Sequence, residues 1–243
     1  SLKNYINAKF KLLSSQTSKC FAYVKKDDEL INKIIKTKKF KIKNVKVDTK
    51  KFNKFLKEIT NNYFLSESNK ENLSFVISIS KKLKLKKNLL LKTIQKFKGL
   101  KYRQQVILKK KNLIIINDSK STSFSSSASI LKTSPNIFWL VGGIFKKGDK
   151  LKLKKNDLNH VRAFIYGKNK KFFNKELKNK VKTKNFSNLN DALKNIFTLI
   201  KNERLNTNTI LFSPCAASFD SFKNFEDRGL YFNKLIKNFL NGI

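Results

Sequence analysis

The stretch that decides the fold runs from residue 112 to residue 122 and reads NLIIINDSKST. Its first half is an apolar run of strand length, which predicts a buried strand over 112–118. Its second half carries Asp118 and Lys120, and the hydroxyl residues after them are typical of a helix start. Open α/β sheets bind ligands where strands end and helices begin, so this stretch is the first candidate site.

The same pattern continues beyond this stretch. After Gly99, apolar runs of strand length alternate with segments of helical periodicity. We expect strands near 103–109, 112–118, 137–142, 162–166 and 209–213, and helices near 124–132, 169–179, 188–203 and 220–241. This alternation predicts an α/β fold with a mainly parallel, helix-covered sheet.

The segment before Gly99 has a different pattern. We expect helices at 3–13, 70–83 and 87–96 and a buried strand at 20–24. From residue 31 to residue 51, lysine alternates with Ile, Phe and Val, which predicts edge strands. We therefore expect two domains, at residues 1–98 and 99–243.

The net charge of +39 first indicates a polyanionic partner such as nucleic acid. However, residues 1–98 carry 26 basic and 7 acidic side chains and residues 99–243 carry 29 and 9, so no single arm holds the excess. Only four of the 55 basic residues are arginine, the residue that nucleic-acid readers favour. Abundant Lys, Asn, Ile and Phe are what an AT-rich coding sequence imposes. We therefore expect no specific nucleic-acid partner, and a nonenzymatic basic nucleic-acid-binding protein is the alternative.

Cysteine and histidine are scarce, which excludes a disulfide scaffold and a Cys/His metal cluster. Cys20 and Cys215 lie far apart in the sequence, and this usage predicts a reducing, cytoplasmic location. The single histidine, His160, has no second ligand at metal spacing, so we interpret it as structural. No apolar run reaches membrane-spanning length, and we expect no membrane insertion.

Three polar clusters follow predicted strands: residues 118–122, 142–149 and 213–218. Three such clusters at strand ends predict one shared crevice, whose lysines and hydroxyls suit an anionic substrate. The alternative is three ordinary capping turns with solvated lysines. Arg103 beside a strand start is either a phosphate ligand or a surface ion pair. The sequence contains neither Gly-x-Gly-x-x-Gly nor Gly-x-x-x-x-Gly-Lys-Ser/Thr, so it has no phosphate loop of its own.

These clusters closely resemble the motifs of the Mur ligases. The matching segments, in the family's order and spacing, are NDSKST at 117–122, the Gly142-Gly143 turn with Lys146, and SPCAASFDSFKNFEDRG at 213–229. Upstream, NKEN at 69–72 resembles the family's His-Asn-x-x-Asn element, GLKYR at 99–103 its Gly-Leu-x-His-Arg, and YINAK at 5–9 the segment around its modified lysine. Ser68 stands where the family has His, and Cys215-Ala216 reverses its usual Ala-Cys order. The Asp-Ser-Lys form, in place of Asp-Tyr-x-His, indicates the D-glutamate-adding branch.

The resemblance implies part of a three-domain, ATP-dependent ligase of peptidoglycan precursor synthesis. Residues 1–98 would be the C-terminal part of the central α/β ATPase domain of P-loop type, truncated and without its phosphate loop. Residues 99–243 would be the Rossmann-like C-terminal domain that binds the incoming amino acid. In the implied reaction, ATP phosphorylates the alanyl carboxylate of UDP-N-acetylmuramoyl-L-alanine, and the amine of D-glutamate attacks the acyl phosphate. Mg²⁺ would accompany ATP.

The resemblance also assigns residues by position. Catalytic roles fall on Lys9, as a carbamate that helps hold Mg²⁺, and on Lys120, towards the phosphate region. Nucleotide contacts fall on Asn69 and Asn72 for the adenine, Arg103 for the phosphates and Asp118 for the ribose. D-glutamate contacts fall on Thr122, Lys146, Ser218 and Phe225, the last through its backbone. The family's phosphate loop would lie upstream of Ser1, so we expect the chain alone to have no ligase activity. We also expect it to be a monomer.

Overall fold

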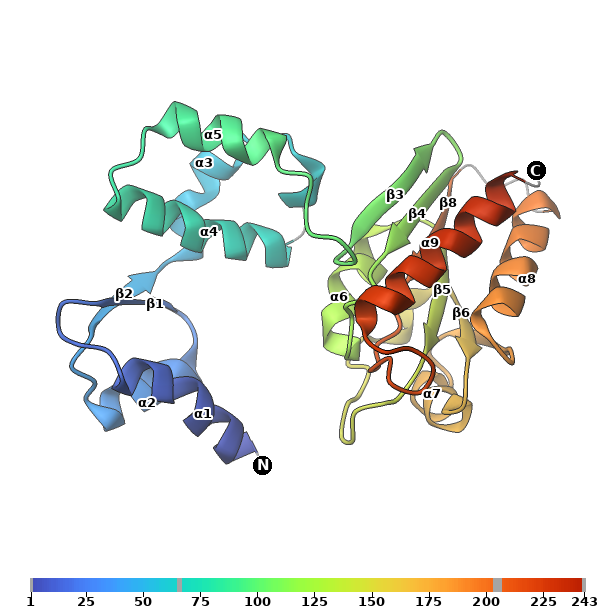
Figure 1. Cartoon of the computed structure of the whole chain (residues 1–243), viewed down its shortest axis with the longest axis horizontal. Coiled ribbons are helices and arrows are strands. Elements are labelled where there is room, and N and C mark those ends of the chain that lie inside the picture. Colours follow the sequence, from blue (N-terminus) through green and yellow to red (C-terminus); the bar gives the residue numbers. More distant parts are fainter. Residues whose placement is uncertain (1, 65–66, 203–206, 242–243) are drawn as a thin grey trace. The chain divides into compact units, whose positions relative to one another are not determined.

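The computed structural model describes residues 2–64, 67–202 and 207–241 (Figure 1). The chain divides into two compact units, Ser1–Lys98 and Gly99–Ile243, and we describe each by itself. Among the described residues, no helix is long and apolar enough to cross a membrane.

The first unit places helices around a two-stranded parallel sheet, in which Phe21 lies opposite Lys43. Its elements are α1 (Leu2–Ser14), β1 (Phe21–Lys25), α2 (Glu29–Lys38), β2 (Lys43–Val47), η1 (Thr49–Phe52), α3 (Asn53–Leu56), η2 (Asn62–Phe64), α4 (Glu67–Lys82) and α5 (Lys87–Lys96). One hydrophobic cluster joins Val47 of β2 to Leu73 and Ile77 of α4 and to Ile94 of α5. The structure confirms the predicted helices at 3–13, 70–83 and 87–96 and the strand at 20–24.

The prediction of edge strands throughout residues 31–51 is wrong in its first half, because Glu29–Lys38 is the helix α2. Asp28 caps this helix, and its side chain accepts a hydrogen bond from the backbone N–H of Ile31 at 2.9 Å. Ile31 and Ile35 are four residues apart, so they lie on one helical face. Both pack against the hydrophobic cluster of Ala22, Val24 and Ile42. The alternation of lysine with apolar residues concealed this spacing.

The second unit is a six-stranded sheet with strand order β3-β4-β8-β5-β6-β7. Its elements are β3 (Gln105–Lys110), β4 (Leu113–Asn117), α6 (Phe124–Thr133), β5 (Ile137–Gly142), η3 (Lys155–Leu158), β6 (Val161–Tyr166), α7 (Lys170–Leu177), β7 (Lys182–Asn185), α8 (Leu189–Asn202), β8 (Asn208–Phe212) and α9 (Phe225–Asn241). Only β3 runs antiparallel to its neighbour, β4; the other pairings are parallel. The predicted α/β class with a mainly parallel sheet is therefore confirmed.

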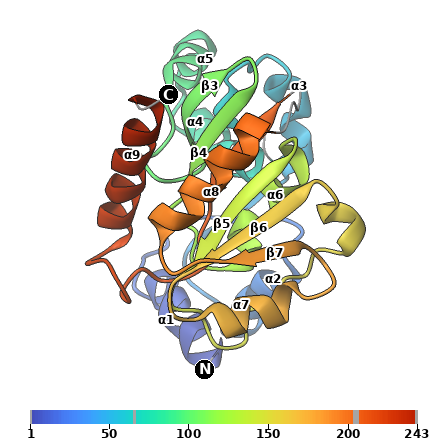
Figure 2. The same cartoon turned by 90° about the vertical axis from the view of Figure 1, so that its right-hand side faces the viewer.

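Helices cover both faces of this sheet (Figure 1). Every residue of β5 is buried, and its side chains alternate between two cores. Trp139 faces the cluster shared with α6 and α7, whereas Phe138 and Leu140 face the cluster shared with α8 and α9. Figure 2 shows α8 lying across the strands. Burial on both faces explains why these strands appear in the sequence as continuous apolar runs.

Two details differ from the sequence-based expectation. The edge strand β7 was not predicted, because its Lys-Thr-Lys-Asn side chains are all exposed and only backbone pairing with β6 makes it a strand. The last helix begins at Phe225 and not near residue 220, because the chain from 213 to 224 forms an irregular loop. The predicted helix 188–203 is α8, and its expected last residue lies outside the described residues.

Close packing of α9 requires glycine at one position. A Cβ atom on Gly229 would lie 2.2 Å from Cδ1 and 2.7 Å from Cε1 of Tyr102, whose side chain is buried. We predict that Gly229→Ala lowers the free energy of unfolding by about 1–3 kcal/mol, because the ring must shift within a packed core. Helix propensity alone would give the opposite sign, a gain of up to about 1 kcal/mol. Urea unfolding followed by the fluorescence of Trp139, the single tryptophan, measures the difference.

The matched control is Leu230→Ala at the next position of α9, where the side chain is 57% exposed. We expect it to change the free energy of unfolding by less than about 0.5 kcal/mol. A Gly229→Ala variant as stable as the wild type would show that Tyr102 moves aside without cost.

Candidate active site

The candidate site is built by three neighbouring parallel strands. β8 lies between β4 and β5, and all three point the same way. Their carboxyl ends therefore meet at one edge of the sheet, where the loops 118–122, 213–218 and 142–149 leave the strands. The sequence predicted that these clusters share one crevice, and the strand order places them side by side.

Backbone and side-chain hydrogen bonds join the three loops directly. The N–H of Asp118 donates to the carbonyl of Phe212 at 2.7 Å, and the hydroxyl of Ser213 donates to Oδ2 of Asp118 at 2.7 Å. On the other side, the N–H of Gly142 donates to the carbonyl of Pro214 at 3.1 Å. Three independent capping turns would not be joined by such hydrogen bonds, so this alternative does not describe the arrangement.

Gly143 permits the close approach of the loops after β5 and β8. Its φ of +126° lies in the region that favours glycine, and an added Cβ atom would lie 2.6 Å from the carbonyl oxygen of Ala217. The next residue, Ile144, forms an antiparallel bridge with Ala217, with both N–H···O distances near 3 Å (3.0 and 2.9 Å). A side chain at Gly143 would separate Lys146 and its loop from the rest of the cluster.

Sequence reasoning gave no role to Arg228, which the structure places at the centre of the cluster. Its guanidinium is 1% exposed and donates through Nη2 to the carbonyls of Ser119 at 2.7 Å and Ala216 at 2.9 Å. Nε donates to the hydroxyl of Ser119 at 3.1 Å. Burial lowers the pKa of this guanidinium. The available signal was its position in the FEDRG motif, as one of four arginines in a lysine-rich chain.

Asp118 is nearly buried, with 5% of its surface exposed. Its Oδ1 accepts from the backbone N–H of Gln104 at 3.0 Å, while Oδ2 accepts from Ser213. Burial raises the pKa of Asp118 to about 6, although these two hydrogen bonds and the positive charges of Arg103 and Arg228 oppose the rise. At neutral pH the carboxyl group is therefore ionised and can only accept hydrogen bonds.

The other predicted residues of the second unit lie around this cluster. Lys120 is half-buried, and its Nζ lies 3.6 Å from the centre of the Phe225 ring, a cation–π contact. Ser218 is buried, whereas Thr122 and Lys146 are exposed on their loops. The carbonyl of Phe225 already accepts a hydrogen bond from Ser119 Oγ at 2.8 Å, so its N–H is the backbone group left for a substrate.

Arg103 is exposed on the turn that precedes β3. The neighbouring residue of this turn, Gln104, donates to Asp118, and the charge of Arg103 is close enough to lower the pKa of that carboxyl group. The structure therefore brings together a guanidinium and a carboxylate that the sequence placed 15 residues apart.

Three predicted site residues lie in the first unit. Lys9 is exposed on α1, with Nζ 5.5 Å from the centre of the Tyr5 ring. Asn69 and Asn72 lie one turn apart on α4; Asn69 donates to the carbonyl of Tyr63 at 2.6 Å, and Asn72 is exposed. In the described parts of the chain, no group of three His, Cys, Asp or Glu residues could hold a metal ion.

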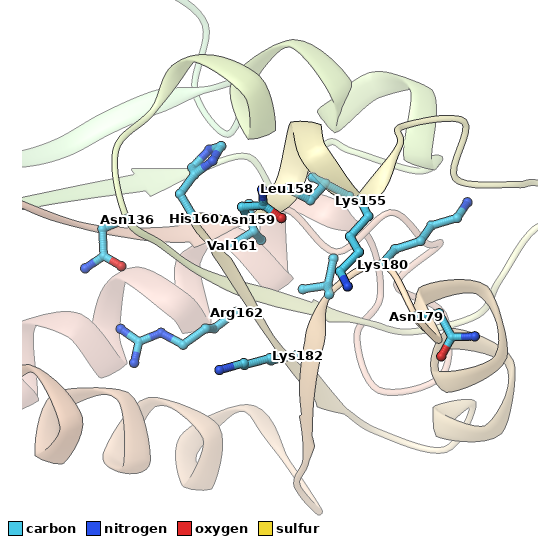
Figure 3. Close-up of a pocket in the computed structure, with 11 residues that line it drawn as sticks. Asn136, Lys155, Leu158, Asn159, His160, Val161, Arg162, Asn179, Lys180 and Lys182 are labelled. Carbon is cyan, nitrogen blue, oxygen red and sulfur yellow. The ribbon is translucent and has the colours of Figure 1, made fainter.

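A hollow of about 390 Å³ lies at the opposite edge of the sheet, at the amino ends of β5, β6 and β7 (Figure 3). Basic residues line much of it, including Arg162, Lys180 and Lys182. His160 also lines it, and its Nε2 lies 2.9 Å from the carbonyl oxygen of Leu131, which fits the predicted structural role. None of the predicted site residues lines this hollow, so it is separate from the candidate site.

The amino-acid sequence is similar to those of ligases from several bacteria. It is 37% identical over 174 residues to the UDP-N-acetylmuramoylalanine–D-glutamate ligase of Wolbachia pipientis wMel, an alignment that covers 70% of this chain and 33% of that protein. The corresponding ligase of Francisella tularensis strain SCHU S4 is 33% identical over 186 residues, with 74% of this chain and 44% of that protein covered. The chain thus spans a third to less than half of these relatives. No protein-family model matches it.

Two solved structures share the fold. The MurF ligase of Thermotoga maritima, in complex with ADP, aligns with a TM-score of 0.64 over 98% of this chain and 59% of that chain, at 11% identity. The UDP-N-acetylmuramate–alanine ligase MurC of the same organism aligns with a TM-score of 0.50 over 73% of this chain and 39% of that chain, at 14% identity. At such identities the likeness concerns the fold alone, but it agrees with the sequence similarity. The sequence similarity, over 70% or more of this chain, therefore relates it to the Mur ligase family.

Proposed function

We propose that this chain is part of an ATP-dependent ligase that adds D-glutamate to UDP-N-acetylmuramoyl-L-alanine in peptidoglycan precursor synthesis. The observation that carries the proposal is the joined cluster at the ends of β4, β8 and β5, built from the segments that resemble the family's motifs. The relatives named as D-glutamate ligases support it. They do not favour the alternative of a nonenzymatic nucleic-acid-binding protein, and the basic charge is spread over both units.

The D-glutamate site would lie between the loops after β4, β5 and β8. A dicarboxylate needs a cation together with neutral donors, and these loops offer the ammonium of Lys146, the hydroxyls of Thr122 and Ser218, and the N–H of Phe225. The hydrogen bonds between the loops support this assignment, because they keep donors from three strands near one another before substrate arrives.

The nucleotide would lie against the turn before β3 and the end of β4. The carboxylate of Asp118 is ionised at neutral pH and suits the hydroxyls of a ribose, while the exposed Arg103 suits phosphate oxygens. Lys120 follows Asp118 by two residues and would lie towards the phosphates. The adenine contacts assigned to Asn69 and Asn72 of α4 stay predictions from the resemblance.

The residues present fit ATP better than they fit Mg²⁺. ATP, when bound, would supply the phosphoryl group that activates the alanyl carboxylate. The chain's own residues would orient the D-glutamate amine towards that carboxylate, and well-oriented reactants can gain about 7–11 kcal/mol. Lys9 is the one residue assigned to Mg²⁺, as a carbamate, and a single exposed ligand does not make a magnesium site.

The role of Lys146 can be tested in the 243-residue chain by titration with D-glutamate, followed by NMR. We predict that Lys146→Ala raises the Kd about tenfold or more, because a charge-assisted hydrogen bond contributes about 1.5–3 kcal/mol. In an active ligase containing this chain, the same change should raise the KM for D-glutamate more than the KM for ATP.

Lys147→Ala is the matched control, since Lys147 is the next residue and is also exposed. It removes the same charge and should leave the Kd unchanged. Equal losses in both variants would mean that only the general positive field attracts D-glutamate, and the assigned role would be wrong.

The role of Asp118 can be tested by titration with ADP. Asp118→Asn keeps the side-chain shape but removes the negative charge, and we predict that it weakens ADP binding about five- to tenfold. In the wild type, ADP binding should strengthen as the pH rises through about 6, because the protonated carboxyl group loses acceptor capacity. The variant should lack that rise. Isothermal titration calorimetry at pH 5 and pH 7.5 measures both effects.

A control for this experiment is Lys101→Ala, which alters an exposed charge on the turn that holds Arg103. We expect a smaller loss of ADP affinity and an unchanged pH dependence. If Asp118→Asn binds ADP as the wild type does at both pH values, Asp118 does not contact the nucleotide.

A further inference from the structure

A chain of buried serine hydroxyls leads to the carboxylate of Asp118. Ser213 Oγ lies 2.7 Å from Oδ2 of Asp118, Ser127 Oγ lies 2.5 Å from Ser213 Oγ, and Ser121 Oγ lies 2.8 Å from Ser127 Oγ. The three serines come from the loop after β8, from α6 and from the loop after β4, and each is at most 2% exposed. Four consecutive polar groups are thus connected inside the unit, away from bulk water.

Hydrogen-bond chemistry gives this chain one direction while Asp118 is ionised. A carboxylate can only accept hydrogen bonds, and a serine hydroxyl carries one proton. The hydroxyl of Ser213 must therefore donate to Asp118. The hydroxyl of Ser213 then accepts from Ser127, and Ser127 in turn accepts from Ser121. Aligned hydroxyls polarise one another, which strengthens the final donor to the carboxylate.

Further hydrogen bonds hold the backbone of Ser213 and the second carboxylate oxygen of Asp118. Trp139 Nε1 donates to the carbonyl of Ser213 at 2.8 Å from the fully buried strand β5. The other carboxylate oxygen, Oδ1, accepts from the N–H of Gln104, which lies in the turn before β3. Both oxygens of Asp118 are therefore held by donors from opposite sides.

We propose that Ser213 is a positioning residue, whose hydroxyl, supported by Ser127 and Ser121, holds the Asp118 carboxylate in one orientation and in its charged form. The functional meaning of this inference rests on the proposed contact between Asp118 and the nucleotide. Its test does not, because the charge state of Asp118 can be measured without any ligand.

The electrostatic surroundings of Asp118 make its charge state depend on the hydroxyl of Ser213. Burial raises the pKa of the carboxyl group to about 6, and the hydrogen bond from Ser213 is the strongest of the influences that oppose the rise. The others are the N–H of Gln104, Arg103 on the turn before β3 and Arg228 on α9. Cys215, after β8, is also close, but burial raises the pKa of its thiol to about 12, so it is neutral. Without Ser213, part of the Asp118 population would be protonated at neutral pH.

The same geometry makes the direction of the chain depend on the charge of Asp118. Because Gln104 N–H faces Oδ1, an added proton would lie on Oδ2, and Ser213 would then have to accept. Ser213 would donate to Ser127 instead. Ser127 has two neighbours that can accept its proton: Cys215 Sγ at 2.9 Å and Ser121 Oγ at 2.8 Å, and Ser121 precedes Thr122 in the proposed D-glutamate site. The hydroxyl chain thus connects the two proposed binding regions.

The test is a pH titration of the aspartate side-chain carboxyl carbons by NMR in the 243-residue chain, with Asp118→Asn identifying the Asp118 signal. We expect Ser213→Ala to raise the measured pKa of Asp118 by about 1–2 units, the shift that corresponds to losing a hydrogen bond to a charged group. Ser213→Cys keeps the side chain's size with a weaker donor and should give a smaller rise. Ser127→Ala leaves the last donor in place and should give the smallest rise.

Thr209→Val is the matched control. Thr209 is a fully buried hydroxyl residue of β8, the strand that leads to Ser213, and its hydroxyl has no hydrogen bond among the described residues. This control should leave the pKa of Asp118 unchanged, because it does not touch the carboxyl group. Trp139 fluorescence reports whether each variant folds, and Ser213→Cys carries the test if Ser213→Ala does not.

An unchanged Asp118 pKa in the folded Ser213 variants would overturn the proposal, and so would an equal shift in Thr209→Val. Neither result involves a nucleotide. A failure of the proposed function would instead appear as ADP binding that is insensitive to Asp118→Asn, so the two failures are distinguishable.

Discussion

The buried guanidinium of Arg228 is the interaction on which the candidate site depends. It reaches from the first turn of α9 to the carbonyls of Ser119 and Ala216, which belong to the loops after β4 and β8. A charged group loses its hydration when it is buried, and its pKa is accordingly lowered. Nε and Nη2 donate to neutral oxygens, whereas Nη1 is buried with no hydrogen-bond partner among the described residues, so these hydrogen bonds offset only part of that cost. A lysine could not replace it, because one ammonium cannot present the planar fork that reaches both loops and the Ser119 hydroxyl.

The net charge of +39 does not determine the architecture of the site. Most lysines project from the surface of both units, where water screens them. The buried polar groups are instead concentrated at the carboxyl ends of β4 and β8, and include Asn117, Asp118, Ser119, Ser121, Ser213 and Ser218. Polar groups in a core are costly unless all are paired, so a connected cluster at a strand edge indicates a functional surface.

This cluster joins the two halves of the proposed reaction. Asp118 and Arg103 would face the nucleotide, whereas Thr122, Lys146 and Ser218 would face D-glutamate. The loop after β4 contributes to both, and Ser119 within it bonds to α9 through Arg228 and through the carbonyl of Phe225. A hydrogen-bonded surface shared in this way suits a ligase, because the enzyme must hold two substrates in register while one attacks the other.

The sequence by itself determined the α/β class, the strands β4, β5, β6 and β8, and most helices, because apolar runs and helical spacing are local signals that burial enforces. It also supplied every residue proposed to contact a substrate, through motifs whose assigned roles stay predictions, but it gave no role to Arg228 or Ser213. It missed α2, where lysines between the isoleucines imitated strand alternation, and β7, whose side chains carry no apolar signal. Only the tertiary structure decided that β8 lies between β4 and β5, since strand order depends on long-range pairing. That order buried Asp118, raised its pKa, aligned the serines behind it and gave Arg228 its place, because desolvation and hydrogen-bond geometry exist only once distant segments have packed together.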